Sequence, residues 1–502
     1  MTLARGERVA VIANARLAVP DRLDPFGDEP VDIHLTGGVI ADIAAAGALS
    51  RHGTVLDASG MWLIPGLWDH HVHTVQWALV AQREHLGQAA SAAEAARIMS
   101  AAPVLADGRR VGTGFRDALW ADAPSLALLD AATGDVPTYL INADVHSVWL
   151  NSAALRREGF ESDGTGLLRE VPAFEISRRL NEVDPAIGEA LVTQMATDAA
   201  SRGVVGLVDL DMAWNEPAWA RRLDAGFDVL RVEFGIYPDL LDRAIAEGLR
   251  TGDRVRGAVS DLVRVGPLKV ITDGSLGTRT AACSHAYPGD PRNHGVLTVD
   301  PADLVELMTR ATGAGLACAI HAIGDVANSH ALDAFAASGA VGTIEHAQLV
   351  SAVDIPRLAR LGVAASVQPE HAIDDRDLTD TIWAGQTAIA YPLRALAESG
   401  AVLRFGSDAP VSPLDPWAAI AAAVFRTRDG RPAWRPEQAL DAATALAAST
   451  HGGSGEGAAT IEPGAVADLA LVEHNPLTAD EARLRAQRVF ATMIEGRLTH
   501  VA

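Results

Sequence analysis

From about residue 200 onward, the sequence alternates short apolar, β-rich runs with segments of helical length. Seven such runs occur, at 204–211, 230–237, 268–274, 316–323, 342–348, 362–369 and 402–408. The segments between them, such as 241–250, 301–314 and 326–338, are rich in Ala, Leu, Arg and Glu. Strands that alternate regularly with helices predict a parallel sheet covered by helices, so this part of the chain belongs to the α/β class.

An eighth strand is expected upstream, at 62–68 (WLIPGLW), directly before the sequence DHHVH at 69–73. Eight strand–helix units predict a distorted, closed (β/α)8 barrel of the TIM type. An open, doubly wound sheet is the alternative. It is disfavoured because no glycine-rich dinucleotide-binding turn follows the first strand.

The remaining segments predict additions to this barrel. Residues 74–191 are too many for one crossover helix and contain their own turns, so we expect an insertion of about that extent in the first βα loop of a barrel spanning 61–451. Residues 1–60 and 452–502 contain short strand-like runs, and neither end is long enough to form a stable sheet alone. We therefore expect both ends to form one small composite β-sandwich domain.

Composition excludes several classes of protein. Hydrophobic residues make up 49% of the 502, which excludes wholesale disorder. The net charge of −23 disfavours nucleic acid and anionic membranes as partners. Two cysteines cannot form a disulfide framework or a thiolate zinc site, and no apolar run reaches the roughly 20 residues of a membrane span. We expect a cytoplasmic protein with a small-molecule substrate, and a homodimer is left open.

Potential metal ligands lie at or near the carboxyl ends of the expected strands, where barrels of this type place their reacting groups. The candidates are His71, His73, Lys269, His321, His346 and Asp408. His71 and His73 are two residues apart in an extended segment, so both imidazoles point to one side. Each residue alone has a structural explanation, such as a buried hydrogen bond or a turn cap. Together they predict a site for zinc or a similar divalent metal.

Lys269 is the only lysine in the chain, against forty arginines. A protonated lysine offers only hydrogen-bond donors and would be repelled by metal ions. A lysine that has reacted with CO2 carries a carbamate, whose oxygens can bridge two cations, and arginine cannot do this because its pKa is too high. We therefore predict a carbamate on Lys269. An ion pair between Lys269 and a barrel carboxylate is the alternative.

Several motifs resemble those of a known family. The segment IPGLWDHHVH at 64–73 resembles the opening signature of the amidohydrolase superfamily. Similarity to its family 3, the YtcJ-like hydrolases related to N-substituted formamide deformylases, is carried by further segments: LKVITDGSLGTRTA at 268–281, HAIGD at 321–325, IEHAQ at 344–348, SVQPEH at 366–371, FGSDAP at 405–410 and DVHSVWLNS at 144–152.

The resemblance extends from the N-terminal strands through Asp468. It implies a composite β-domain, a distorted metal barrel with one or two ions, and hydrolysis of amide-like bonds. Its Asp-x-His-x-His spacing assigns His71 and His73 as ligands, so that His70 points the other way and packs outside.

The expected mechanism follows from the ligands, because divalent metals acidify water and polarise a carbonyl. Asp408 has an oxygen free to accept the proton of the water and pass it to the leaving nitrogen. His346 or His371 could stabilise the developing oxyanion. Substrate contacts are expected from His371, Gln368 and His146. Arg279 either holds an anionic substrate group or forms a structural salt bridge.

These features predict a zinc-dependent hydrolase that cleaves the C–N bond of an amide, formamide or cyclic amide. A deaminase or an ester hydrolase on the same barrel is the alternative. Lys269 favours the hydrolase, because a deaminase with one metal has no use for a bridging carbamate. A barrel that merely binds a partner would leave the ligand set without a purpose.

Overall fold

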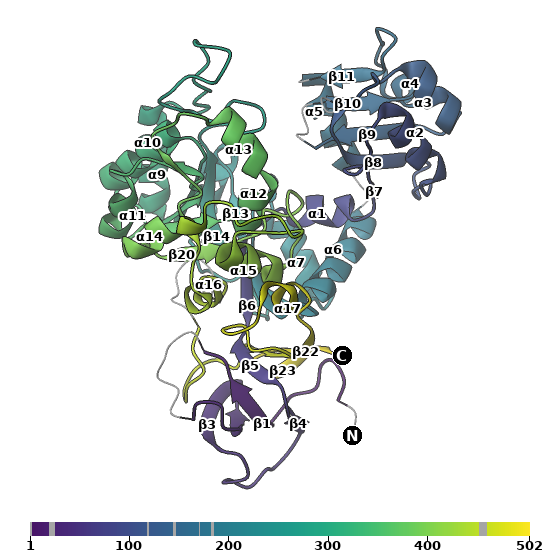
Figure 1. Cartoon of the computed structure of the whole chain (residues 1–502). Coiled ribbons are helices and arrows are strands. Elements are labelled where there is room, and N and C mark those ends of the chain that lie inside the picture. Colours follow the sequence, from purple (N-terminus) through teal and green to yellow (C-terminus); the bar gives the residue numbers. More distant parts are fainter. Residues whose placement is uncertain are drawn as a thin grey trace. The chain divides into compact units, whose positions relative to one another are not determined.

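The computed structural model describes residues 3–19, 26–117, 120–143, 147–169, 171–181, 185–450 and 459–502 (Figure 1). The chain divides into two compact units. The first consists of residues 1–74 and 193–502, and the second of residues 75–192. Within the described segments, no helix combines the length and the apolar character needed to cross a membrane.

The centre of the first unit is a nearly closed barrel of parallel strands, which confirms the predicted fold class. Its strands in the described chain are β6 (Leu67–Val72), β12 (Val204–Asp209), β13 (Arg231–Ile236), β14 (Val263–Ile271), β15 (Cys318–Ala322), β16 (Gly342–His346), β18 (Ala364–Val367) and β20 (Leu403–Phe405), in this spatial order. The two end strands meet through backbone hydrogen bonds. Asp408 N donates to His71 O at 2.8 Å, and His73 N donates to Ala409 O at 2.9 Å.

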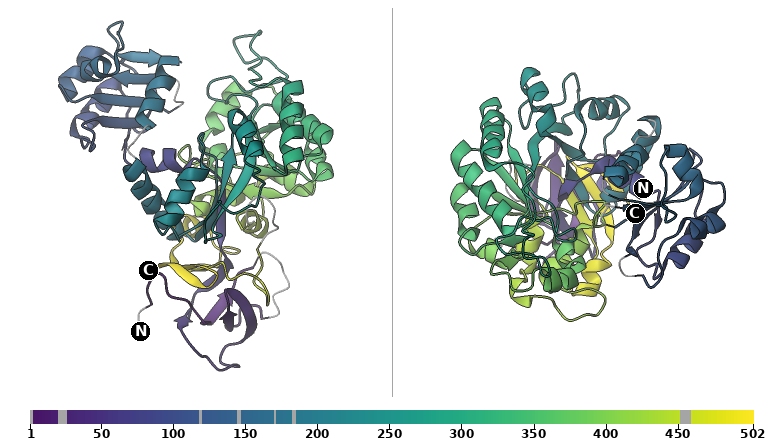
Figure 2. Two further views of the ribbon diagram at one scale, coloured as in Figure 1. Left: turned by 180° about the vertical axis from the view of Figure 1, so that it is seen from behind. Right: turned by 90° about the horizontal axis from the view of Figure 1, so that it is seen from above.

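Helices surround this barrel (Figure 2, right). They are α7 (Glu216–Asp224), α8 (Leu241–Ala246), α9 (Pro301–Ala314), α10 (Asp325–Ser338), α11 (Ile355–Leu361), α14 (Leu393–Glu398), α15 (Pro416–Phe425) and α16 (Ala442–Ala448). Local sequence explains their limits. Asp300 caps the first turn of α9 through Ala302 N, and Gly315, Gly339 and Gly362 end three of the helices in the left-handed conformation that glycine adopts without strain.

The prediction of a single strand at 62–68 is wrong, because the chain forms two strands there. β5 (Trp62–Pro65) pairs with strands of both chain ends, whereas β6 belongs to the barrel. The change of sheet occurs at Gly66, where an added Cβ would lie 2.4 Å from Cγ1 of Val205. The chain can pass so close to β12 only without a side chain. As a consequence, His70 and His71 lie within β6 and do not follow it.

Strands from both chain ends share one sheet. Its order is β23 (Arg497–Val501), β22 (Val489–Ile494), β21 (Leu469–Val472), β5, β1 (Val11–Leu17), β2 (Val31–Thr36) and β3 (Val39–Ala45), with β4 (Val55–Asp57) paired to β1. Alternate residues of these strands, among them Ile12, Ile33, Leu63, Leu471 and Met493, form a single buried apolar cluster. The cluster contains residues from both chain ends, so each end buries its apolar face against the other.

The second unit is an α/β unit with its own core. Its sheet has the order β11 (Leu167–Arg169), β10 (Ser147–Leu150), β9 (Thr138–Asn142), β8 (Arg110–Phe115) and β7 (Glu84–His85). Its helices include α2 (Ala92–Ala101), α3 (Leu126–Thr133), α4 (Ser152–Glu158) and α5 (Val171–Asn181). Separate apolar clusters form around Phe115 with Trp149 and around Tyr139 with Leu155. α1 (Thr74–Val80) and α6 (Pro185–Ala200) contain the points where the chain leaves and re-enters the first unit.

An ion-pair network joins the barrel to the terminal sheet within the first unit. Arg231, the first residue of β13, donates from Nε to Asp468 Oδ2 at 2.6 Å and from Nη2 to Glu495 Oε1 at 3.0 Å. Asp468 also accepts the backbone N–H of Glu495 at 2.8 Å. The Arg231 and Asp468 side chains are only 17% and 15% exposed, so removal of one partner leaves the other charge poorly solvated.

We predict that Arg231→Met lowers the free energy of unfolding by at least about 2 kcal/mol, between the values typical of exposed and of fully buried pairs. Denaturant unfolding at neutral pH measures this loss. Arg483→Met is the matched control, because Arg483 and Asp480 form an ion pair in which both side chains are more than half exposed. Equal losses for the two variants would show that the Arg231 network contributes no more than an ordinary surface pair.

Candidate metal centre

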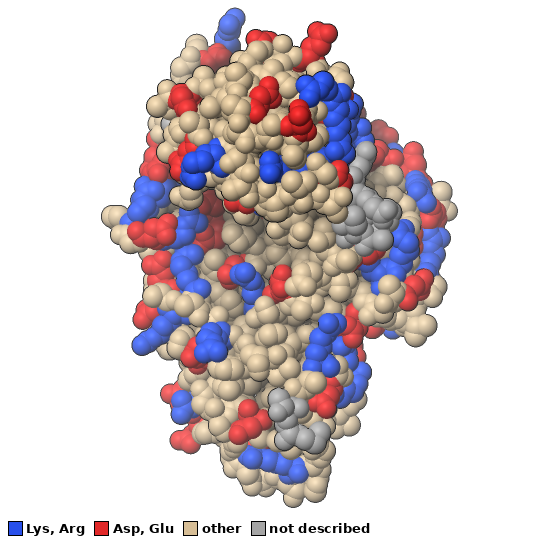
Figure 3. Space-filling view, turned by 90° about the vertical axis from the view of Figure 1, so that its right-hand side faces the viewer, with Lys and Arg blue, Asp and Glu red and all other residues tan. Residues whose placement is uncertain are grey.

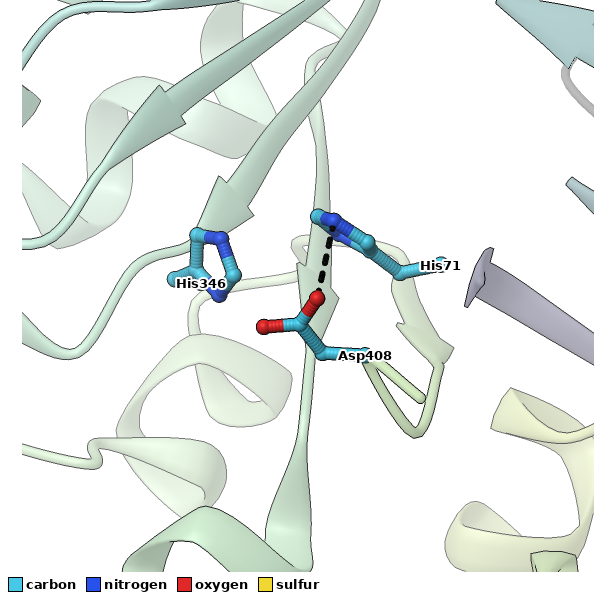
Figure 4. A group of neighbouring side chains, drawn as sticks. All are labelled: His71, His346 and Asp408. Atoms are coloured by element: carbon cyan, nitrogen blue, oxygen red, sulfur yellow. Dashed lines mark ion pairs between the residues drawn. The ribbon is translucent and has the colours of Figure 1, made fainter. Parts of the chain in front are cut away.

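Three buried side chains converge at the carboxyl end of the barrel (Figure 4). His71 comes from β6, His346 ends β16, and Asp408 follows β20. One potential ligand atom from each lies within 4.8 Å of the others. The three come from strands far apart in sequence, and only closure of the barrel brings them together.

Unusual backbone conformations aim two of these side chains. His346 and Asp408 have φ values of 74° and 57°, in the left-handed region that L-residues seldom occupy. Asp408 is held there because its N–H bonds to His71 O across the closure of the barrel. Such strain is retained where the surrounding structure determines it, and it is concentrated at functional sites.

A carboxylate fixes the orientation of His71. His71 Nδ1 donates to Glu345 Oε2 at 2.7 Å, and Glu345 also accepts a hydrogen bond from the hydroxyl of Thr343. Burial and the charge of Lys269 lower the pKa of His71 to about 4. Burial alone would raise the pKa of Glu345, but the hydrogen bond and charge of His71 bring it down to about 2. His71 is therefore neutral at pH 7, with its proton on Nδ1 and a lone pair on Nε2.

The lone pair on His71 Nε2 faces the carboxylate of Asp408. This arrangement shows whether the residues fit a metal ion. His71 Nε2 and His73 Nε2 lie 3.4 and 3.3 Å from Asp408 Oδ1. A lone pair opposite a carboxylate oxygen is repulsive unless a cation lies between them. Ligand atoms 2.0–2.1 Å from one tetrahedral zinc ion are about 3.3–3.4 Å apart. Both the chemistry and the spacing of these donors fit a divalent cation.

His73 extends the cluster on the side of β6. Its Nδ1 is buried and has no hydrogen-bond partner in the described part of the chain. Burial would lower the pKa of His73, but the hydrogen bond and charge of Asp408 raise it above the ordinary value. For Asp408, burial acts to raise the pKa, yet the neighbouring histidines His71, His73 and His346 hold it well below the usual range. Asp408 is therefore ionised.

Lys269 and His321 reach the same end of the barrel from β14 and β15. The Lys269 side chain is 1% exposed, and its Nζ has no hydrogen-bond partner among the residues described. Burial lowers its pKa against the opposing charges of Glu345 and Asp408. The ring of His321 packs edge-on against His346, with centroids 4.5 Å apart, and its Nε2 lies 3.3 Å from Asp273 Oδ1.

The two residues predicted past β18 lie beside His346. His346 Nδ1 donates to Gln368 Oε1 at 2.9 Å, so the amide oxygen of Gln368 has a partner within the protein. His371, in α12 (Pro369–Asp374), is stacked on His346, and its Nε2 lies 4.0 Å from Asp408 Oδ2. The structure thus brings together His71, His73, His321, His346, Asp408, His371 and Gln368.

Two other residues, His70 and Arg279, are not part of this cluster. His70 is buried and bonds elsewhere: its Nδ1 lies 2.9 Å from Phe405 O, and its ring is stacked on Trp68. Arg279 is exposed in the loop after β14, and no contact joins it to the cluster in the described structure. His146 lies outside the described residues.

Two carboxylates that hold the centre in place were missed by sequence reasoning. Asp69 accepts the backbone N–H groups of Ser407 and His71 at 2.9 and 3.1 Å, and burial raises its pKa to about 6. Asp273 accepts three backbone N–H groups, from Ala282, Ile323 and Gly324. Asp69, Asp273 and Glu345 all lie within the motifs named in the sequence analysis. Their positions in sequence do not show which residues are potential metal ligands and which residues hold those ligands in place.

Comparisons with known proteins show the family of this chain. Residues 54–500 match the sequence profile described as the Amidohydrolase family. The chain is 27% identical to Protein LONG AFTER FAR-RED 3 of Arabidopsis thaliana, over 97% of this chain and 91% of that protein. It is 26% identical to the N-substituted formamide deformylase of Arthrobacter pascens, over 93% of this chain and 94% of the relative.

A solved structure shows the same fold. The crystal structure of an uncharacterized metal-dependent hydrolase from Pyrococcus horikoshii superimposes with a TM-score of 0.79 at 24% identity, covering 94% of this chain and 99% of the other. The family profile spans the barrel and the part of the terminal sheet that follows residue 54, and the histidines and aspartate that could hold a metal lie at the carboxyl end of that barrel. This chain is a member of the amidohydrolase family, with the fold of the metal-dependent hydrolases.

Proposed function

We propose that this amidohydrolase uses zinc to cleave the carbon–nitrogen bond of a small-molecule amide, formamide or cyclic amide. The observation that carries the proposal is the geometry of the buried His71, whose Nδ1 donates to Glu345 so that its Nε2 lone pair faces Asp408 Oδ1 at 3.4 Å. The deformylase of Arthrobacter pascens, a relative over almost its full length, supports an amide-like substrate. Figure 3 shows acidic and basic side chains mixed on one face, which favours a small molecule over nucleic acid as the partner.

The donors for one or two ions are His71, His73, His321, His346 and Asp408. When bound, a divalent ion acidifies water and polarises the carbonyl that is attacked. The protein orients these metal-ligating side chains by burying them. It also pairs Nδ1 of His71 with Glu345 and Nδ1 of His346 with Gln368. Such partners fix the tautomer of a ligating histidine.

Asp408 is the proposed proton carrier. Its Oδ1 is close to His71 and His73, whereas its Oδ2 faces His371 at a longer distance. One oxygen is therefore free to accept a proton from the attacking water and then to deliver it to the nitrogen of the leaving amine. Because its neighbours keep Asp408 ionised, it is a proton acceptor before attack and becomes a donor afterwards.

Lys269 is proposed to carry a carbamate. Its neutral amine would attack the carbon of CO2, a C–N bond would form, and one amine proton would be released to solvent. The buried Nζ, which has no hydrogen-bond partner among the residues that the structure describes, supports this, because an unmodified ammonium without such a contact is costly to bury. A carbamate would provide two oxygen ligands at the base of the cluster.

A substrate panel tests the reaction class. Zinc-loaded protein would be assayed with N-formyl amines, N-acyl amino acids, hydantoins, lactams and aryl esters. Turnover of at least one C–N substrate, lost on chelation, is the expected result. Activity confined to the esters would contradict the proposed bond class, and deamination of an aminated heterocycle would favour the alternative reaction.

We predict that His71→Ala and His346→Ala lose bound metal, because each removes a donor with an oriented lone pair. His70→Ala is the matched control, since His70 lies in the same strand and is equally buried but bonds to Phe405 O. Elemental analysis of the purified variants measures the ions per chain. A His70→Ala protein that has lost its metal would show that the wrong histidines of the segment DHHVH at 69–73 have been assigned as ligands.

Asp408→Asn should keep the fold and much of the metal, because an amide oxygen remains as a weak ligand. Turnover should fall by about three orders of magnitude, since the amide can neither accept nor deliver the proton. Steady-state kinetics at matched metal content measure the change. A rate near that of the parent protein would remove Asp408 from the proton transfer.

Lys269→Ala should lose at least one ion and most activity, and a high concentration of acetate or propionate should restore part of both. Lys269→Arg should not be rescued, because its permanent charge fills the same space. Metal analysis with and without the acid provides the measurement. An unmodified Lys269 in a crystal structure of fully metallated, active protein would disprove the carbamate.

A further inference from the structure

His346 and His371 lie face to face in the metal centre, with ring centroids 6.3 Å apart and planes inclined by 12°. Each has its Nδ1 next to the side chain of a glutamine, Gln368 for His346 and Gln348 for His371. A neutral imidazole carries one N–H and one lone pair, and the partner of each nitrogen determines which is which. The two glutamines therefore decide what each ring offers to the cluster.

For His346, the contacts of Gln368 leave a lone pair on Nε2. Gln368 Nε2 lies 3.5 Å from the backbone oxygen of Ser366, which can only accept a hydrogen bond. The amide nitrogen of Gln368 therefore faces Ser366, and its oxygen faces His346 Nδ1 at 2.9 Å. Because that oxygen can only accept, the proton of His346 is on Nδ1 and its Nε2 is free to bind a cation.

For His371 the assignment is reversed. The amide Nε2 of Gln348, and not its oxygen, lies 3.5 Å from His371 Nδ1, at the long limit of a hydrogen bond, and Gln348 Oε1 has no partner among the described residues. On the other side, His371 Nε2 faces the anionic Oδ2 of Asp408 at 4.0 Å. Both contacts favour the same tautomer, with the lone pair on Nδ1 and the proton on Nε2. This Nε2 is buried and has no hydrogen-bond partner within the described residues, so its N–H is available.

We infer that His371 is a catalytic hydrogen-bond donor and not a metal ligand, and that Gln348 and Gln368 are positioning residues for the two rings. The Nε2–H of His371 donates to the carbonyl oxygen of the scissile amide as negative charge develops there. His346, with its proton turned away toward Gln368, cannot perform this role. The inference rests on the proposed function. It identifies His371, and not His346, as the residue that stabilises the developing oxyanion. No covalent bond to either histidine is involved.

The first experiment compares His371→Leu with His346→Leu. His371→Leu should retain the metal content of the parent protein, and its kcat should fall about 100-fold or more with little change in KM, as when an oxyanion donor is removed. His371→Gln, which places an amide N–H at the same position, should recover part of that loss. His346→Leu should lose metal. Loss of metal from His371→Leu, or a kcat equal to that of the parent, would overturn the inference.

The second experiment compares the glutamines. Gln368→Leu should weaken zinc binding by about 10–100-fold, the usual effect of removing the partner of a ligating histidine. Gln348→Leu should leave zinc affinity unchanged and lower kcat. Equal zinc affinities in the two variants, or a weaker affinity only in Gln348→Leu, would overturn the assignment.

A spectroscopic test does not depend on turnover. In zinc-loaded protein labelled with 15N-histidine, the ring signals lost in His371→Leu should show the proton on Nε2, and those lost in His346→Leu should show it on Nδ1. A proton on Nδ1 of His371 would overturn the inference even if the substrate class is right. Conversely, if no C–N substrate is turned over, the proposed function fails while the tautomers still test the roles of the two rings.

Discussion

The hydrogen bond from Asp408 N to His71 O, at 2.8 Å, is the contact on which the candidate centre depends. It joins the last strand of the barrel to the first, and it also holds Asp408 in a left-handed conformation that directs its carboxylate toward His71 and His73. Closure of the barrel and formation of the candidate metal-binding cluster are therefore the same structural event. A barrel open between β20 and β6 would separate the donors that the cluster requires.

Much of the surrounding polar structure serves to orient these donors. Glu345 fixes the ring of His71, Gln368 fixes that of His346, and Asp69 holds the backbone of both β6 and the segment after β20. Each support is buried, so it would be costly without its partner. The result is a centre whose donors are arranged before any ion binds, which reduces the reorganisation that binding requires.

The terminal sheet and the second unit contribute in different ways. The terminal sheet takes strands from both chain ends around one apolar cluster, and Arg231 ties it to the barrel through Asp468 and Glu495. The second unit has its own sheet and its own apolar clusters. A barrel can accept such an insertion in a loop because the parallel strands and their helices already account for the core beneath the site.

The sequence alone determined the class of fold and predicted the chemical character of the centre. Alternation of apolar runs and helical segments predicted the barrel, because side-chain periodicity follows from local backbone geometry. The positions of His71, His346 and Asp408 near the strand ends predicted a metal cluster, because parallel strands bring their carboxyl ends to one edge. The switch of sheets at Gly66 was missed, since it depends on how closely β6 approaches Val205.

Only the tertiary structure decided the roles of individual residues. Glu345 precedes His346 in sequence but supports His71, a residue 274 positions away. Gln368 was expected to contact substrate, which stays a prediction, and its amide oxygen accepts a hydrogen bond from His346. Arg279 lies within the motif at 268–281, yet its side chain is exposed outside the cluster. Which nitrogen of an imidazole carries the proton depends on partners brought from other strands, and no local pattern in the sequence specifies those partners.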